Sequence, residues 1–323
     1  MGGPVGARGR RLIGGVALLT VPVLLAALPL VPMFVLLERV GLGGLGGLGS
    51  AVIGVIAAGI VGLGGAAIVG PILVERRIRR LPAAELEDRP ADFVADRVAA
   101  LADEVGVDPP TVTVIRADAA NVAAVDGHRG SRLVVSTRLL SLPQDDRDAA
   151  LRHALVRIKR REAVVTTALI PALALVETVA LLATLLVGRR SERTAADRRV
   201  NRIHGYEPER KRIPSWLYTA AGVLLWVLLL PAWIPAAVGD RLYVSGGRQS
   251  ADAVVAGIGT AERDGLGNAV AFASDAAGAA DWPPLLDRLS LVSMADDETG
   301  RIRGTSRQEA RVRLARLRSK RAL

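Results

Sequence analysis

The chain has 323 residues, of which 50% are hydrophobic and 23% charged, and its formal net charge is +10. The mean hydropathy of +0.33 is too high for an ordinary soluble domain, while the charge content is too high for a bare bundle of membrane helices. The absence of cysteine excludes disulfides, thiolate zinc sites, iron–sulfur clusters and cysteine nucleophiles. An aromatic content of 3% argues against a stacking surface for single-stranded nucleic acid, so nucleic acid is not an expected partner.

Four apolar stretches are each long enough to cross a lipid bilayer, which takes about 20 residues. They are expected at residues 12–37, 51–74, 163–187 and 216–238. A glycine-rich linker joins the first two into a hairpin, and arginines flank both ends of that hairpin. By the positive-inside rule these arginines lie in the cytoplasm. The sequence therefore predicts a multi-pass protein of the cell membrane that contacts the lipid bilayer and has a cytoplasmic main domain.

The spans divide the chain into four consecutive parts. These are an N-terminal transmembrane hairpin (1–74), the first part of a folded domain (75–162), a second transmembrane hairpin (163–239) and the rest of the domain with a basic tail (240–323). The loop 188–214 is rich in arginine, which the positive-inside rule disfavours on the outer side. Either this loop is an exception, or the second hairpin is re-entrant or packed inside protein.

The segment between the second and third spans has the patterns of a small folded domain. Apolar residues at helical spacing, β-branched residues in alternation and a turn with two glycines distinguish its elements. The expected elements are a helix at 91–105, a strand at 111–115, a hairpin with strands at 122–125 and 132–136, and a helix from about 146 to 162. The expected fold class is α+β, mostly helical with a small β-sheet.

The stretch 145–162 reads DDRDAALRHALVRIKRRE. This stretch, with the order of spans, helices and strands around it, resembles the HtpX-like membrane zinc metalloproteases, which are related to the CAAX prenyl proteases. Weaker matches to other motifs of that family lie at 121–127, 137–140 and 245–252. The resemblance implies a gluzincin-like domain. In the family, the helix that corresponds to 145–162 carries the zinc-binding sequence H-E-x-x-H.

That pattern places two histidines one helical turn apart, so that both bind one zinc ion, and its glutamate polarises the attacking water. In this chain His153 matches the first histidine. Ala154 stands in place of the glutamate, and Arg157 stands in place of the second histidine. Alanine cannot accept a proton, and the guanidinium of arginine is a permanent cation without a lone pair for a metal.

The family's third zinc ligand, a glutamate, is also missing. Alignment on Asp252 places Arg248 at its position, whereas alignment on Ser245 places Gln249 there. Asp252 itself resembles the aspartate that supports the zinc ligands in the family. Without zinc, Asp252 is expected to pair with Arg157 or Arg248 and so to neutralise the site. No cofactor is expected, and zinc is expected only if other side chains rebuild the site.

Other ionisable residues offer few substitutes. His128, in the predicted turn, and His204, in the loop between the last two spans, are placed by no motif. Glu177 lies inside the third span, where a charge is costly, so it is a functional candidate unless it faces protein. The basic stretch 301–323 is expected to form a solvated amphipathic helix near the membrane.

Three functions are consistent with these features. The first is a non-catalytic relative of the HtpX-like proteases that binds a membrane-protein substrate or partner, with 132–136 as an edge for strand addition. The second is an active zinc-dependent membrane endopeptidase in protein quality control. The third is a membrane protein whose basic tail binds anionic lipid. Because Ala154, Arg157 and Arg248 replace the catalytic glutamate and two zinc ligands, we favour the first.

Overall fold

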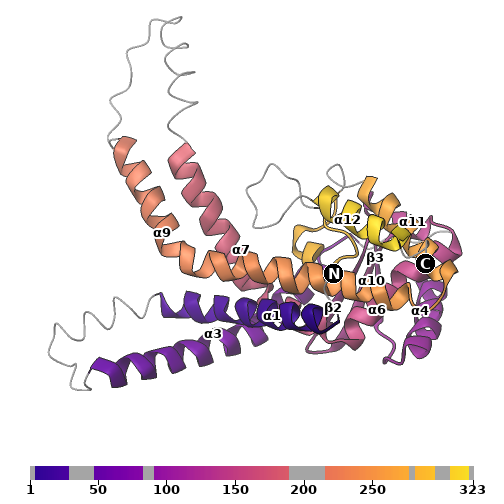
Figure 1. Ribbon diagram of the computed structural model, residues 1–323, viewed down its shortest axis with the longest axis horizontal. Coiled ribbons are helices and arrows are strands. Elements are labelled where there is room, and N and C mark those ends of the chain that lie inside the picture. The colour runs from indigo at the N-terminus through magenta and orange to yellow at the C-terminus, as the bar shows by residue number, and fades with distance from the viewer. Residues whose placement is uncertain are drawn as a thin grey trace, which may run out of the picture.

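The computed structural model describes residues 4–28, 47–82, 91–188, 215–275, 281–294 and 306–319. Within these residues the protein is mostly helical, with a three-stranded sheet and four helices that are long and apolar enough to cross a membrane. The long helices extend away from a folded domain that contains the sheet (Figure 1). The predicted combination of four long apolar helices with an α+β domain is therefore confirmed.

The long apolar helices coincide with the predicted spans. They are α1 (Pro4–Ala27), α3 (Gly47–Ile78), α7 (Glu162–Gly188) and α9 (Ser215–Gly239). The end of the first predicted span and the arginine-rich loop after α7 lie outside the described residues. α9 continues through a π-helical turn, η1 (Asp240–Val244), into α10 (Ser245–Val255). These three elements form one uninterrupted helical segment that runs from the apolar part of the molecule into the domain.

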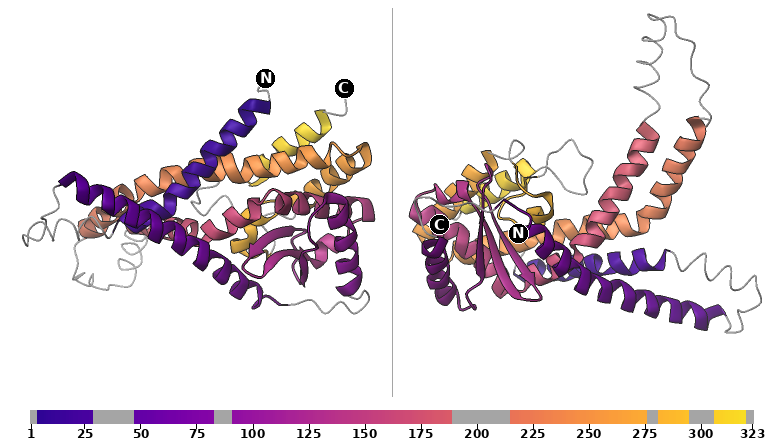
Figure 2. Two further views of the ribbon diagram at one scale, coloured as in Figure 1. Left: turned by 90° about the horizontal axis from the view of Figure 1, so that it is seen from below. Right: turned by 180° about the vertical axis from the view of Figure 1, so that it is seen from behind.

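The long helices form two pairs that pack together near the domain and diverge farther out. Figures 1 and 2 show α1 beside α3 and α7 beside α9, with the two pairs separating toward their far ends. The side chains buried where the pairs meet include Leu18, Leu169, Leu173 and Leu229. α9 contains Pro231 and Pro235, which lack an N–H and clash with the preceding turn, and this explains the bend of α9 in Figure 1.

The sheet contains β1 (Thr111–Ile115), β2 (Val122–Gly127) and β3 (Gly130–Ser136) in the order β1-β3-β2. β3 pairs in parallel with β1 and antiparallel with β2. The predicted strand and hairpin are confirmed, and Gly130, directly after the hairpin turn, has a φ of +103°, which favours glycine. The expectation that 132–136 forms an edge is wrong, since this strand is central and has a partner on each side.

Short helices complete the domain. They are α4 (Ala91–Val105), α5 (Thr137–Leu140), α6 (Gln144–Lys159), α11 (Thr260–Asp275), the 3-10 helix η2 (Pro284–Leu289) and α12 (Ser306–Ser319). α4 has the predicted bounds. The next predicted helix ends earlier than expected, because Arg161 takes a left-handed φ of 55° and turns the chain from α6 into α7.

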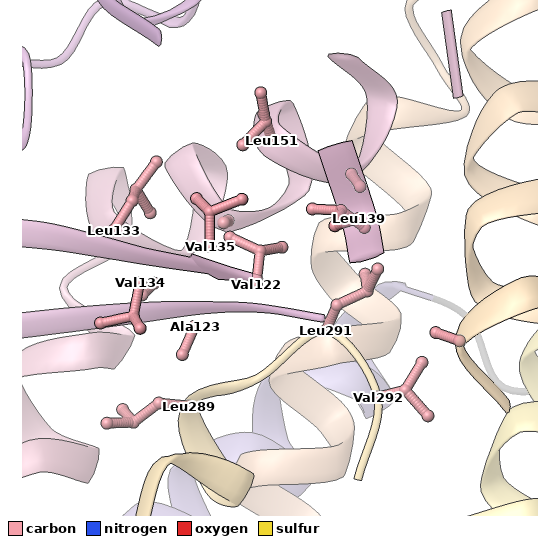
Figure 3. Packing of buried hydrophobic residues seen from close by; sticks show 14 of the residues in the cluster. Val122, Ala123, Leu133, Val134, Val135, Leu139, Leu151, Leu289, Leu291 and Val292 are labelled. Carbon is pink, nitrogen blue, oxygen red and sulfur yellow. The ribbon is translucent and has the colours of Figure 1, made fainter. Parts of the chain in front are cut away.

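Both faces of β3 are buried in the core of the domain. Leu133 and Val135 point toward α6 and meet Leu151, whereas Val134 points to the opposite side, toward Leu289 (Figure 3). Side chains alternate between the faces of a strand, so these positions follow the expected period of two. The sheet therefore contributes apolar side chains to the core from both of its faces.

α3 and α7 touch closely at Gly70, where an added Cβ atom would lie 2.5 Å from the carbonyl oxygens of Thr167 and Ala168. We expect Gly70→Ala to lower the free energy of unfolding in detergent by about 1–3 kcal/mol, the usual cost of overpacking. Gly64→Ala, on the same helix with open space around it, is the control and should be neutral or slightly stabilising. Equal effects of both substitutions in denaturant titrations would contradict this packing.

Candidate functional site

An extended segment, 281–294, crosses the domain, and we call it the strap. It contains η2 and then follows the outer edge of β2. Ser290 forms an antiparallel bridge with Ala123, and the Leu291 N–H donates to the Val122 carbonyl at 2.8 Å. The strap thus lies where an added strand would pair with β2.

Hydrogen bonds to Asn121 and within the strap fix its path. The Asn121 amide donates to the Val292 carbonyl at 2.7 Å, and the Asn121 oxygen accepts from the Val292 N–H at 3.3 Å. The Trp282 indole donates to the Ser290 hydroxyl at 2.8 Å, and that hydroxyl donates to the Leu286 carbonyl at 2.6 Å. Buried polar groups need such partners, so these bonds hold the strap in one conformation.

α6 carries the stretch that resembles a zinc-binding helix. His153 on α6 is fully buried, and its Nε2 lies 3.3 Å from both the Arg248 carbonyl oxygen and Asp252 Oδ1. Both neighbours are acceptors, so Nε2 carries the proton of the neutral ring. Nδ1 has no hydrogen-bond partner among the described residues. Burial lowers the pKa of His153 more than Asp252 raises it, which favours the neutral ring.

Arg157 lies one helical turn further along α6 and is 1% exposed. Its Nη1 donates to the carbonyls of Leu289 at 2.6 Å and Ser290 at 3.2 Å. Its Nη2 donates to the carbonyl of Arg288 at 3.0 Å. The planar guanidinium therefore binds three successive carbonyl groups of the strap, a task suited to its fixed array of donors.

Arg157 keeps its charge inside the domain. Burial and the nearby charge of Arg248 lower the pKa of Arg157 to about 10, so the group is still protonated at neutral pH. Glu162, at the start of α7, lies 3.7 Å from the Nε of Arg157 and also binds Arg11 of α1 at 2.5 Å. The carboxylate of Glu162 thus links this buried cation to α1.

Two further arginines hold the strap from other helices. Arg248 on α10 donates from Nη2 to the Asp287 carbonyl at 2.6 Å and from Nε to the Ser290 carbonyl at 3.0 Å. Arg313 on α12 donates from Nη1 to the Leu291 carbonyl at 2.5 Å. The arginine clamp, as we call this group, consists of Arg157, Arg248 and Arg313.

The last two arginines of the clamp are paired with carboxylates. Glu309 on α12 accepts from Arg248 at 3.0 and 3.2 Å. Asp252 on α10 accepts two bonds of 2.7 Å from Arg313. Burial opposes ionisation of Glu309, but Arg248 and Arg313 outweigh it and lower the pKa of Glu309. These pairs bind α10 and α12 to each other as well as to the strap.

The expected pairing of Asp252 with Arg157 or Arg248 is therefore wrong, because its partner is Arg313. The described part of the tail forms the expected amphipathic helix with an exposed face, but its other face is packed rather than solvated. α12 turns one face to the domain, and the residues buried on it are Ala310, Arg313 and Leu317. Because these residues are three and four positions apart, they lie on one face of the helix. In a tail with many arginines, however, the sequence does not show which arginine is buried.

The donors in this cluster do not fit the zinc ion that the sequence resemblance implies. His153 offers a nitrogen, but Arg157 and Arg248 have no lone pair to give a metal, and their charge would repel it. Gln249, the other position aligned with the glutamate ligand, is bonded to Arg316 near the surface. Among the described residues, no group of three or more His, Cys, Asp or Glu side chains is placed to hold a metal ion.

Glu177 of α7 faces protein. Its Oε1 accepts from Arg288 Nη2 at 2.7 Å, and Arg288 Nε donates to Asp240 Oδ1 at 2.7 Å. Arg288 belongs to the strap and Asp240 to η1. Glu177, although it lies in an apolar helix, therefore has its partner in the folded domain. Burial opposes the charge of Arg288, but Asp240 and Glu177 outweigh it and raise the pKa of Arg288. The triad ties the strap to α7 and to the end of α9.

The remaining histidine candidates do not join this cluster. His128 is exposed in the turn between β2 and β3, and its Nε2 lies 3.3 Å from the Ile68 carbonyl oxygen of α3. His204 lies outside the described residues. The sequence thus identified His153, Arg157, Arg248 and Asp252 as neighbours, and it missed Arg288, Glu309 and Arg313.

No protein-family model matches the chain, and neither a curated protein nor a solved structure matches it. The resemblance to the HtpX-like proteases therefore rests on the sequence motifs. The class that the fold itself defines is a mostly helical protein with four candidate membrane spans and a small three-stranded sheet, within the described residues.

The Asp252–Arg313 pair allows a direct test of the clamp. Asp252→Asn removes the carboxylate that is hydrogen-bonded to the buried Arg313, so we expect the free energy of unfolding to fall by about 3–5 kcal/mol. Arg316→Gln, which alters an exposed bond of the same helix, should change it by less than about 0.5 kcal/mol. Denaturant titrations in detergent measure both. A loss for Asp252→Asn no larger than that of the control would refute the pairing.

His153 predicts a pH dependence of stability. Its pKa in the folded protein is below the ordinary value near 6.5, so the unfolded chain binds a proton that the folded chain does not as the pH falls below about 6.5. Stability is then present above this pH and is lost below it, by up to about 1.4 kcal/mol per pH unit. We expect His153→Gln to flatten this part of the pH profile. An unchanged slope would show that other groups cause it.

Proposed function

We propose that this chain is a membrane-embedded, non-catalytic relative of the HtpX-type zinc metalloendopeptidases and acts by binding a membrane-protein segment or partner. In this proposal its gluzincin-like domain faces the cytoplasm. The observation that carries the proposal is Arg157. This residue occupies the sequence position of a zinc ligand, and its guanidinium donates to three carbonyls of the strap.

The surroundings of Arg157 support a loss of peptide hydrolysis. Metal-assisted hydrolysis needs a metal-bound water and a base beside it. Ala154, at the position of the base, is 2% exposed within the packed core and has no proton acceptor in its side chain. The strap lies along the outer edge of β2 beside this helix, so the chain's own backbone takes the place that an added peptide strand would use.

The apolar surface of the long helices supports a role in binding. Farther from the domain than the place where the two helix pairs pack together, α7 and α9 expose large apolar side chains. Among them are Leu181, Leu182, Leu185, Leu224, Val227 and Leu228. Helices associate in lipid through van der Waals packing of such surfaces, without a hydrophobic driving force. Arg288 fixes α7 and the end of α9 to the strap, so a partner helix bound to them would lie beside a firmly attached domain.

One preparation of the full chain in detergent tests both halves of the proposal. Elemental analysis should find far less than one zinc per chain, because the cluster offers too few donors. A labelled single-span membrane peptide, added to the same micelles, should bind saturably and stay intact. A soluble peptide of the same length without the apolar span is the control.

Two results would overturn the proposal. About one zinc per chain that survives dialysis, together with cleavage of the membrane peptide, would identify an active endopeptidase with a rebuilt site. Absence of any saturable binding of the membrane peptide would remove the binding role. In the first case, His153→Ala and His128→Ala would identify the zinc ligands by loss of metal.

A further inference from the structure

The turn between β2 and β3 projects from the domain to the side of α3. The right panel of Figure 2 shows the hairpin extending toward this helix. His128 Nε2 lies 3.3 Å from the Ile68 carbonyl oxygen, and Arg129 Nη1 lies 3.7 Å from Glu75 Oε1. A pocket between the hairpin and α3 is lined by residues of both, including Pro71, Glu75, Ile78, Gly127, Arg129 and Arg132.

The length of α3 places the hairpin tip at the membrane surface. The apolar stretch of α3 runs from Ile53 to Val74, which is 22 residues, or about 33 Å, enough to cross the hydrocarbon core of about 30 Å. Glu75, the first charged residue after this stretch, therefore lies where the headgroup layer begins, and that layer is about 5–7 Å thick on each side of a bilayer. Arg129 at the hairpin tip lies beside Glu75, and therefore at the level of the lipid headgroups.

The surface at this level is strongly positive. Its exposed or half-buried arginines are Arg76, Arg77, Arg79, Arg80, Arg129, Arg132 and Arg161. The acids among them are Glu75, which accepts from Arg79 at 2.6 Å, and Asp126 of β2. The positive charge therefore exceeds the negative charge on a surface that faces the headgroups.

Arg129, in the hairpin turn, is open to solvent. Its side chain is 75% exposed, and its ion pair with Glu75 spans 3.7 Å. An exposed pair of this length contributes little, so the pair does not account for the position of the guanidinium. Arginine binds phosphate through paired N–H donors, and basic residues close to a membrane are attracted to anionic lipids. The position and the chemistry of Arg129 thus match a lipid phosphate.

We propose that Arg79, Arg129 and Arg132 form a binding site for the headgroup of an anionic lipid. The phosphate is bound by guanidinium groups from two directions, α3 and the hairpin, and the acyl chains follow the apolar surface of α3 into the bilayer. An acidic protein segment would meet the same charge, but at this level it would have to enter the headgroup layer. The site is independent of the arginine clamp and of the binding role proposed above.

Lipid retention by the full chain tests the site. The purified protein is exposed to equal amounts of phosphatidylglycerol and phosphatidylcholine, and the lipids that stay bound are measured by native mass spectrometry. We expect phosphatidylglycerol to be retained preferentially. Arg129→Gln with Arg132→Gln should reduce that preference about 30-fold, since each arginine near a membrane surface contributes a factor of about five.

The control removes the same charge elsewhere. Arg311→Gln with Arg318→Gln acts on exposed arginines of α12 and should leave the lipid preference unchanged. An equal loss in both double variants, or a loss only in the α12 variant, would overturn the proposal. Displacement of the lipid by millimolar inorganic phosphate would also overturn it, by showing a site for the free anion. If Arg132→Gln impairs folding, Arg129→Gln alone gives the same comparison, because its side chain projects from an exposed turn.

Discussion

Three buried arginines donate hydrogen bonds to the backbone carbonyls of the strap, and the arrangement of the domain depends on these bonds. The strap has little regular pairing, so its buried carbonyl groups need donors from elsewhere. A buried guanidinium needs acceptors just as strictly, since an unpaired buried polar group costs about 1–3 kcal/mol and a charged one more. Arg157, Arg248 and Arg313 come from α6, α10 and α12. The bonds that satisfy the strap therefore also fix these three helices relative to the sheet.

The same strap connects the domain to the long apolar helices. Arg288 turns away from the clamp and binds Glu177 of α7 and Asp240 of η1. α9 continues into α10 through η1, so Arg248 and Asp252 lie on the continuation of a long apolar helix. A displacement of the strap would consequently disturb both the clamp and the attachment of α7, which makes the junction one cooperative unit.

The relation to zinc proteases that we propose needs no change in the local backbone. Side chains four residues apart on a helix lie on the same face whatever their chemistry, so α6 presents Arg157 beside His153 as it would present two histidines. Histidine has a lone pair for a metal, whereas arginine has donors for carbonyl oxygens. With arginine at this position, the helix face binds backbone carbonyl oxygens in place of a metal ion, and the strap provides these oxygens. The lipid surface on α3 and the hairpin uses a different group of arginines and a different side of the molecule.

The sequence by itself determined the local elements, and it showed that the side chains at the site differ from those that bind zinc. The spans, α4, the three strands and the absence of the zinc ligands follow from periodicity, turn residues and side-chain chemistry, all of which act over a few residues. The tertiary structure decided the pairings. Asp252 binds Arg313, 61 residues away, and Glu177 binds Arg288, 111 residues away. Many arginines could neutralise either carboxylate, and only the packing of α12 and the strap selects which ones are buried. For the same reason β3 became the central strand, because the addition of β1 to the hairpin depends on long-range packing that strand patterns do not record.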